Sequence, residues 1–134
     1  EVSATATTIS LSFGGGETEA QLGGAPLLSY GLFRGSTALI GVDSYSTDTT
    51  FTDSGLTAGV EYTYTYKILN KHGWSDVSPS VTIKASETPT IIPNPPTTAN
   101  SGLSVSISWD APTSDNGSAI TAYTVQVKKS DGSF

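Results

Sequence analysis

The sequence predicts an all-β protein, an antiparallel β-sandwich, and three observations carry this prediction. Apolar and polar residues alternate with period two in several short runs, as they do in strands with one buried face. Ser and Thr supply 40 of the 134 residues, which favours extended structure because Thr is β-branched and Ser competes for backbone hydrogen bonds. Clusters rich in Gly, Pro, Asn and Asp separate the runs, and no window has the spacing of an amphipathic helix.

Four runs in the first two thirds of the chain are expected to form strands. They are TTISLSF (7–13), LSYGLFRG (28–35), YTYTYKI (62–68) and SVTIKAS (80–86). In each run the residues two apart point to the same side of a sheet, so the apolar set should face the core. The residues expected on the buried face are Ile9, Leu11 and Phe13, then Tyr30 and Leu32, then Tyr62, Tyr64, Tyr66 and Ile68, and finally Val81 and Ile83.

Residues 87–96, ETPTIIPNPP, differ from these runs because they contain four prolines. Proline cannot donate a hydrogen bond to a sheet, and it favours the extended polyproline conformation. This segment is therefore expected to be a linker that is stiff rather than flexible.

The strand pattern begins again after the linker, which indicates an internal repeat. SVSISWDAP (104–112) has the form of TISLSFGGG (8–16), and GSAITAYTVQV (117–127) has the form of GAPLLSYGLF (24–33). In this alignment Trp109 stands where Phe13 stands in the first copy, and Tyr123 stands where Tyr30 stands.

The repeat divides the chain into three expected parts. Residues 1–86 form one nearly complete domain, residues 87–96 form the linker, and residues 97–134 form the first half of a second domain. Half a sandwich leaves an open edge and a half-covered core. We therefore expect the chain to continue, or, less favoured, a neighbouring chain to complete the second domain.

Composition excludes several classes of function. The net charge of −6 and the pI of about 4.4 argue against a nucleic-acid partner, because an acidic surface repels phosphates. The absence of Cys excludes disulfides and thiolate metal sites. The sequence contains no stretch of 18 apolar residues, so no membrane-spanning helix is predicted. No nucleophile–base pair or metal set is apparent, so neither enzymatic activity nor a cofactor is expected.

The motifs of both copies resemble the fibronectin type III family. The similar features are SISWDAP with its Trp, a Tyr followed two residues later by an aliphatic residue, and Leu56 followed by Tyr62, Tyr64, Tyr66, Asn70, Gly73 and Ser78. The residue sequences of the two copies are also similar to tandem fibronectin type III modules of large secreted or surface proteins of microbial eukaryotes. Two departures are Phe13, where the family has Trp, and the long loop 14–26.

The resemblance implies an immunoglobulin-like sandwich with Tyr62 at a tyrosine corner, where its hydroxyl meets nearby backbone. It also implies that Asn70 and Gly73 shape the turn before the last strand. The expected structural core comprises Phe13, Tyr30, Leu56, Tyr62, Tyr64, Tyr66, Trp109 and Tyr123.

Candidate sites are few, and each has an ordinary structural alternative. His72, the only histidine, lacks paired ligands and is interpreted as a solvated turn residue. Asn116-Gly117-Ser118 is an N-glycosylation sequon, although Asn-Gly also suits a turn.

Trp74 is a candidate contact for a partner, a neighbouring domain or a sugar, or it packs on its own sheet. The candidate O-glycosylation sites are Thr88, Thr90, Thr97 and Thr98; Asp43, Asp48, Asp110 and Asp115 fit turns better than a calcium loop.

The sequence thus predicts a non-enzymatic structural module of a long extracellular repeat protein, a cell-surface appendage or fibril component. Its expected partners are further copies of itself or neighbouring repeat domains, and glycans. The alternative is an adhesion or receptor module, or a carbohydrate-binding or spacer module beside a polysaccharide-degrading domain. Fold alone does not decide between them.

Overall fold

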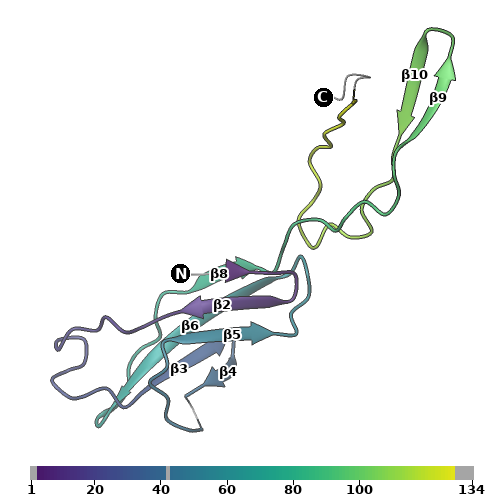
Figure 1. The fold of residues 1–134 in the computed structure, drawn as a ribbon. Coiled ribbons are helices and arrows are strands. Elements are labelled where there is room, and N and C mark those ends of the chain that lie inside the picture. The colour runs from purple at the N-terminus through teal and green to yellow at the C-terminus, as the bar shows by residue number, and fades with distance from the viewer. Residues whose placement is uncertain (1–2, 42, 129–134) are drawn as a thin grey trace.

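The computed structural model describes residues 3–41 and 43–128, and Figure 1 shows its arrangement of strands. The described residues contain ten strands and no helix. The strands are β1 (Ser3–Ala4), β2 (Thr8–Ser12), β3 (Ser29–Arg34), β4 (Thr37–Ile40), β5 (Thr50–Ser54), β6 (Glu61–Asn70), β7 (Gly73–Trp74), β8 (Val81–Lys84), β9 (Thr97–Ser101) and β10 (Ser104–Ser108).

The first eight strands form two antiparallel sheets. One sheet has the order β1-β2-β5. The other has the order β4-β3-β6-β7, with β8 pairing the first half of β6 while β7 pairs its end. The longest strand, β6, therefore organises its sheet, because it pairs β3 along one edge and both β7 and β8 along the other.

The core lies between the two sheets, which makes the fold a β-sandwich and confirms the predicted fold class. The inward residues of β2 meet those of β3 and β6 from the opposite sheet. Removing these apolar side chains from water is the main favourable contribution to folding. The buried cluster consists of Ile9, Leu11, Leu32, Leu56, Tyr64 and Ala85, with Phe13, Tyr62 and Tyr66 among the residues that pack against it.

The alternating tyrosines of β6 all belong to this interior. Tyr64 is 1% exposed, and Tyr62 and Tyr66 flank the buried cluster. The Tyr62 hydroxyl accepts a hydrogen bond of 2.9 Å from the backbone N–H of Thr57, in the connection that precedes β6. This contact is the one that the tyrosine-corner resemblance implies. Tyr30, from β3, is 2% exposed and packs edge-on against Phe13.

The four predicted runs appear as β2, β3, β6 and β8. Val81 was expected on the buried face but is 45% exposed, because β8 is an edge strand that pairs only with β6. Sequence reasoning missed β1, β4, β5 and β7, which are short or carry few apolar residues. Residues 87–96 contain no strand, and β9 pairs β10 in a hairpin that stands apart from the sandwich (Figure 1). No strand forms over 111–128, although 117–127 resembles the β3 region. A strand needs a hydrogen-bonded neighbour, and the described residues offer none there.

Trp109 and Tyr123 lie in this second part and contact each other, with ring centroids 5.8 Å apart. They are 40% and 42% exposed, respectively. Their matched residues in the sandwich are covered by a second sheet, whereas the described part of the chain supplies no such sheet over this pair. Their place in a buried core therefore stays a prediction, as does the division into domains 1–86 and 97–134, of which residues 1–2 and 129–134 lie outside the described residues.

One buried carboxylate joins the two sheets. Asp53 of β5 is 5% exposed. Nη1 of Arg34, from β3, lies 2.9 and 2.8 Å from its two carboxylate oxygens. The Tyr64 hydroxyl donates to its Oδ2 at 2.8 Å. A buried charge destabilises a fold unless it is paired and hydrogen-bonded, so this pairing keeps β5 aligned with β3 and β6.

We predict that Tyr64→Phe lowers the free energy of unfolding by about 1–3 kcal/mol, because it removes a hydrogen bond to a buried charged group. Urea denaturation of both proteins measures the change. Tyr66→Phe is the matched control, since it removes a hydroxyl from the same strand face, away from Asp53. Equal losses in the two variants would show that the Asp53 contact adds nothing.

Candidate functional site

Trp74 lies on the outer face of the sheet that contains β3 and β6. It pairs with Leu69 of β6, and its ring reaches β3 at Gly31. A Cβ at Gly31 would lie 3.1 Å from the indole and 3.4 Å from the Phe33 ring, so the glycine leaves room for the indole on the strand. Trp74 is still 39% exposed. The ring therefore packs on its own sheet and also offers an aromatic surface to solvent.

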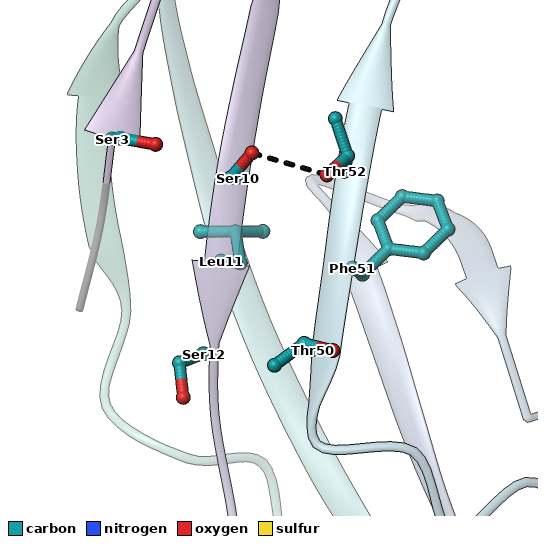
Figure 2. A pocket seen from close by; sticks show the side chains of 7 residues that line it. All are labelled: Ser3, Ser10, Leu11, Ser12, Thr50, Phe51 and Thr52. Carbon is teal, nitrogen blue, oxygen red and sulfur yellow. Dashed lines mark hydrogen bonds between the residues drawn. The ribbon is translucent and has the colours of Figure 1, made fainter.

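The outer face of the other sheet carries hydroxyl groups instead of aromatic rings. Ser10 and Ser12 of β2 stand opposite Thr52 and Thr50 of β5, and Ser3 of β1 stands beside Ser10. Figure 2 shows these side chains, which line a hollow of about 520 Å³. The hydroxyls of Ser10 and Thr52 are 3.0 Å apart and hydrogen-bonded to each other.

This hollow can hydrogen-bond an uncharged polar molecule but offers no acid–base chemistry. Its lining residues are Ser, Thr, Leu and Phe, none of which titrates. A serine nucleophile requires a neighbouring base, and none lines the hollow. On the second sheet Thr63 and Thr82 form a similar hydroxyl pair at 2.9 Å. Both outer faces are thus polar without being charged at these positions.

The long loop 14–26 is tied to the sandwich at two points. The Tyr30 hydroxyl donates to Glu17 Oε2 at 2.6 Å and accepts from the Gly15 N–H at 2.8 Å. The Asn70 side chain donates to the Leu22 carbonyl at 2.7 Å. The pKa of Tyr30 is raised above its ordinary value, mainly because the side chain is buried and secondly because its hydroxyl donates a hydrogen bond to Glu17. The glycine-rich loop is therefore attached by specific polar contacts.

The pKa of Tyr64 is raised more strongly than that of Tyr30. Burial raises the pKa of its hydroxyl well above the ordinary value, and the hydrogen bond to the Asp53 carboxylate raises it further. Perturbed pKa values often mark catalytic sites. Here the Tyr64 side chain is buried between the sheets and its hydroxyl is bonded to Asp53, which is itself paired with Arg34, so these contacts indicate a structural role.

The remaining predicted residues lie in turns and irregular segments outside the strands and do not converge on one site. His72 is exposed, and its backbone N–H donates to Asn70 Oδ1, consistent with a turn residue. The carboxylates of Asp48, Asp110 and Asp115 accept hydrogen bonds from neighbouring or linker groups. Asp43 is exposed. Within residues 3–41 and 43–128, no three His, Asp or Glu side chains are grouped to hold a metal ion.

The candidate glycosylation residues differ in how accessible they are. Thr88, Thr97 and Thr98 are exposed, the last two within β9. Thr90 is half-buried, and its hydroxyl is hydrogen-bonded to Thr113 at 3.1 Å. Asn116 is also half-buried, and Nδ2, the atom that carries an N-linked glycan, donates to the Thr88 carbonyl at 2.7 Å. Glycosylation at these positions stays a prediction.

Sequence reasoning missed the polar group formed by Arg34, Asp53 and Tyr64. A signal for it was present, because Asp53 stands two residues after Phe51 and so shares its inward face. An acidic residue at an inward position needs a cationic or hydrogen-bonding partner. Nothing local in the sequence identifies Arg34 as that partner, since it lies 19 residues earlier in the chain.

No protein-family model matches this chain. The chain is similar to Exoglucanase B of Cellulomonas fimi, with 33% identity over 135 residues. The match covers 92% of this chain and 12% of the relative. The chain therefore resembles a small portion of that enzyme, and the fibronectin type III resemblance stays a prediction. The described residues contain no helix that is long and apolar enough to cross a membrane.

We predict that the free energy of unfolding falls as the pH rises above about 10. Unfolded tyrosines ionise near pH 10. In the folded protein, Tyr30 and Tyr64 keep their protons to higher pH, since both pKa values are raised. The unfolded state then binds fewer protons than the folded state, so stability is full below pH 10 and decreases above it. Urea midpoints between pH 8 and pH 11.5, in steps of about half a unit, measure the decrease. A decrease that Tyr64→Phe leaves unchanged would contradict the assignment to Tyr64.

Proposed function

We propose that this chain is a non-catalytic accessory module of an extracellular polysaccharide-acting protein, in which it holds neighbouring parts at a defined separation. The observation that carries the proposal is the similarity of 92% of the chain to 12% of Exoglucanase B. A stretch of that size accounts for one or two small modules rather than for a whole enzyme. The extracellular location is part of the same proposal.

The contacts of Asp53 support a role without hydrolysis. Most glycosidases place two Asp or Glu side chains on either side of the scissile bond. In the sandwich the buried carboxylate is Asp53, which is paired with Arg34 and hydrogen-bonded by Tyr64 beneath the sheet surface. These contacts give Asp53 a structural role in holding the two sheets together. The hydroxyl faces described above provide solubility and hydrogen bonding, but no proton donor suited to a glycosidic oxygen.

A second candidate, carbohydrate binding, is favoured by Trp74. Its indole is partly exposed on an open sheet face, with Phe33 close to its supporting glycine. An aromatic ring offers an apolar face to the C–H side of a sugar ring, while nearby polar groups hydrogen-bond the sugar hydroxyls. The nearby polar groups are Thr65 and Lys67, which occupy outward positions of β6. Lys67 stands opposite Gly31 of β3, and Thr65 stands opposite Phe33.

We predict that the purified chain releases no sugar from insoluble cellulose or from cello-oligosaccharides. Reducing-end assays after prolonged incubation measure release, with a cellulase as the positive control. Sustained release by the purified chain would contradict the accessory role. The same mixtures, centrifuged, show whether the chain is retained on cellulose, which distinguishes a binding module from a spacer alone.

If the chain is retained on cellulose, a comparison of two variants tests whether Trp74 makes the contact. Trp74→Ala should abolish retention if the indole is the contact, because alanine removes the whole stacking surface. Tyr45→Ala is the matched control, since Tyr45 is a 71% exposed aromatic residue in a different segment. Equal retention by both variants and the unmodified chain would exclude the Trp74 surface.

The fibril or appendage role predicted from the repeat is a separate structural role. It predicts that protein purified from its natural source forms long filaments with a regular axial repeat. Negative-stain electron microscopy tests this directly. Dispersed single particles would remove the fibril role and leave the accessory module unaffected, because a spacer needs no self-assembly.

A further inference from the structure

The turn that comes after Pro112 returns to the start of the linker and pairs with it. The backbone N–H of Glu87 donates to the Asn116 carbonyl at 3.1 Å, and that of Thr90 donates to the Ser114 carbonyl at 3.0 Å. The Asn116 side chain adds a bond of 2.7 Å to the Thr88 carbonyl. The Thr90 hydroxyl adds further bonds, since it donates to the Ser114 carbonyl at 3.2 Å and accepts from the Ser114 N–H at 3.1 Å. These hydrogen bonds join segments that are more than 20 residues apart in sequence.

The same turn touches the sandwich at Gly59, in the connection between β5 and β6. The two glycines are so close that a Cβ on Gly117 would lie 2.2 Å from the Gly59 nitrogen and 2.7 Å from its Cα. No side chain fits at that distance. Gly59 is itself held in place, because its N–H donates to the Ala85 carbonyl at 2.8 Å, at the point where the chain leaves β8.

The turn is also shaped by its own hydrogen bonds. The Asn116 N–H donates to Ser114 Oγ at 3.0 Å, and the Gly117 N–H donates to Asp115 Oδ1 at 2.9 Å. Asn116 has a φ of 49° and Gly117 a φ of 80°, a conformation that Asn and Gly tolerate better than other residues. A turn that is ordered in advance loses little conformational entropy when it docks.

We propose that the sandwich end around Gly59, together with residues 87–90, is a docking surface for the 114–117 turn, and that this contact fixes the direction in which the chain leaves the sandwich. Prolines alone give a semi-rigid linker that still pivots where it meets the sandwich. The docked turn removes that pivot, because it is bonded to the linker and rests on the sandwich. The inference goes beyond the proposed function, since a fixed junction serves a spacer, a binding module or a fibril component equally.

The test is amide hydrogen exchange of the whole chain, measured by NMR. In the unmodified chain the Glu87 and Thr90 amides should be protected, and the Hα protons of Gly59 and Gly117 should show a mutual NOE. Gly117→Ala should remove the NOE and reduce the protection of both amides by about tenfold or more, because a side chain at 117 cannot fit against Gly59. Protection of core amides such as that of Tyr64 should be unchanged, which shows that the sandwich remains folded.

Gly102→Ala is the matched control. Gly102 also has a positive φ, 62°, but it has no atoms within 4 Å of its Cβ position and lies in the β9–β10 turn. This variant introduces the same backbone strain and should leave Glu87 and Thr90 protected. Asn116→Asp, which tolerates positive φ but lacks the Nδ2 donor, should give a partial loss of protection. Unprotected Glu87 and Thr90 amides in the unmodified chain, or identical profiles for the two glycine variants, would overturn the proposal.

Discussion

The need to compensate one buried charge constrains the relation between the two sheets. Asp53 belongs to β5, whereas its partners Arg34 and Tyr64 belong to β3 and β6 of the opposite sheet. Apolar packing tolerates small shifts between sheets, but a buried carboxylate that loses its partners is strongly destabilising. The polar contact therefore selects one alignment of the sheets, and the apolar cluster around Tyr64 fills the space that this alignment leaves.

Several outward strand positions of the sandwich carry hydroxyl groups that pair between neighbouring strands. Ser10 pairs with Thr52 on one face and Thr63 pairs with Thr82 on the other. Such pairs suit strand geometry and make these positions polar without adding charge. They also limit chemistry, since a hydroxyl without a nearby base is a weak nucleophile. Both observations support a module that positions or binds, with Trp74 and Phe33 as aromatic side chains on the outer face of the second sheet.

The two proposals concern different properties of the molecule. The similarity to a portion of Exoglucanase B supports an accessory role for the chain as a whole. The contact between Gly59 and Gly117 concerns how the sandwich is joined to the segment on its C-terminal side. A module that sets a distance is useful only if its junctions resist bending, so the docked turn would give a spacer the stiffness that its proline segment only partly provides.

The sequence by itself determined the fold class and most of the inward residues of β2, β3 and β6, because period-two alternation is a local property that the chain displays directly. It did not determine that Val81 of the edge strand β8 stays 45% exposed, since that depends on how far the opposite sheet extends. It placed Tyr62, Tyr64 and Tyr66 in the interior and His72 at a turn. It did not reveal β5 and β7, whose few residues become strands only through pairing with neighbours. Tertiary structure alone decided that Arg34 meets Asp53, that Trp74 lies over Gly31, and that the turn at Asn116 returns to Thr88. Each of these contacts joins residues distant in sequence, and such partners are selected by the packing of whole sheets and segments rather than by any local pattern.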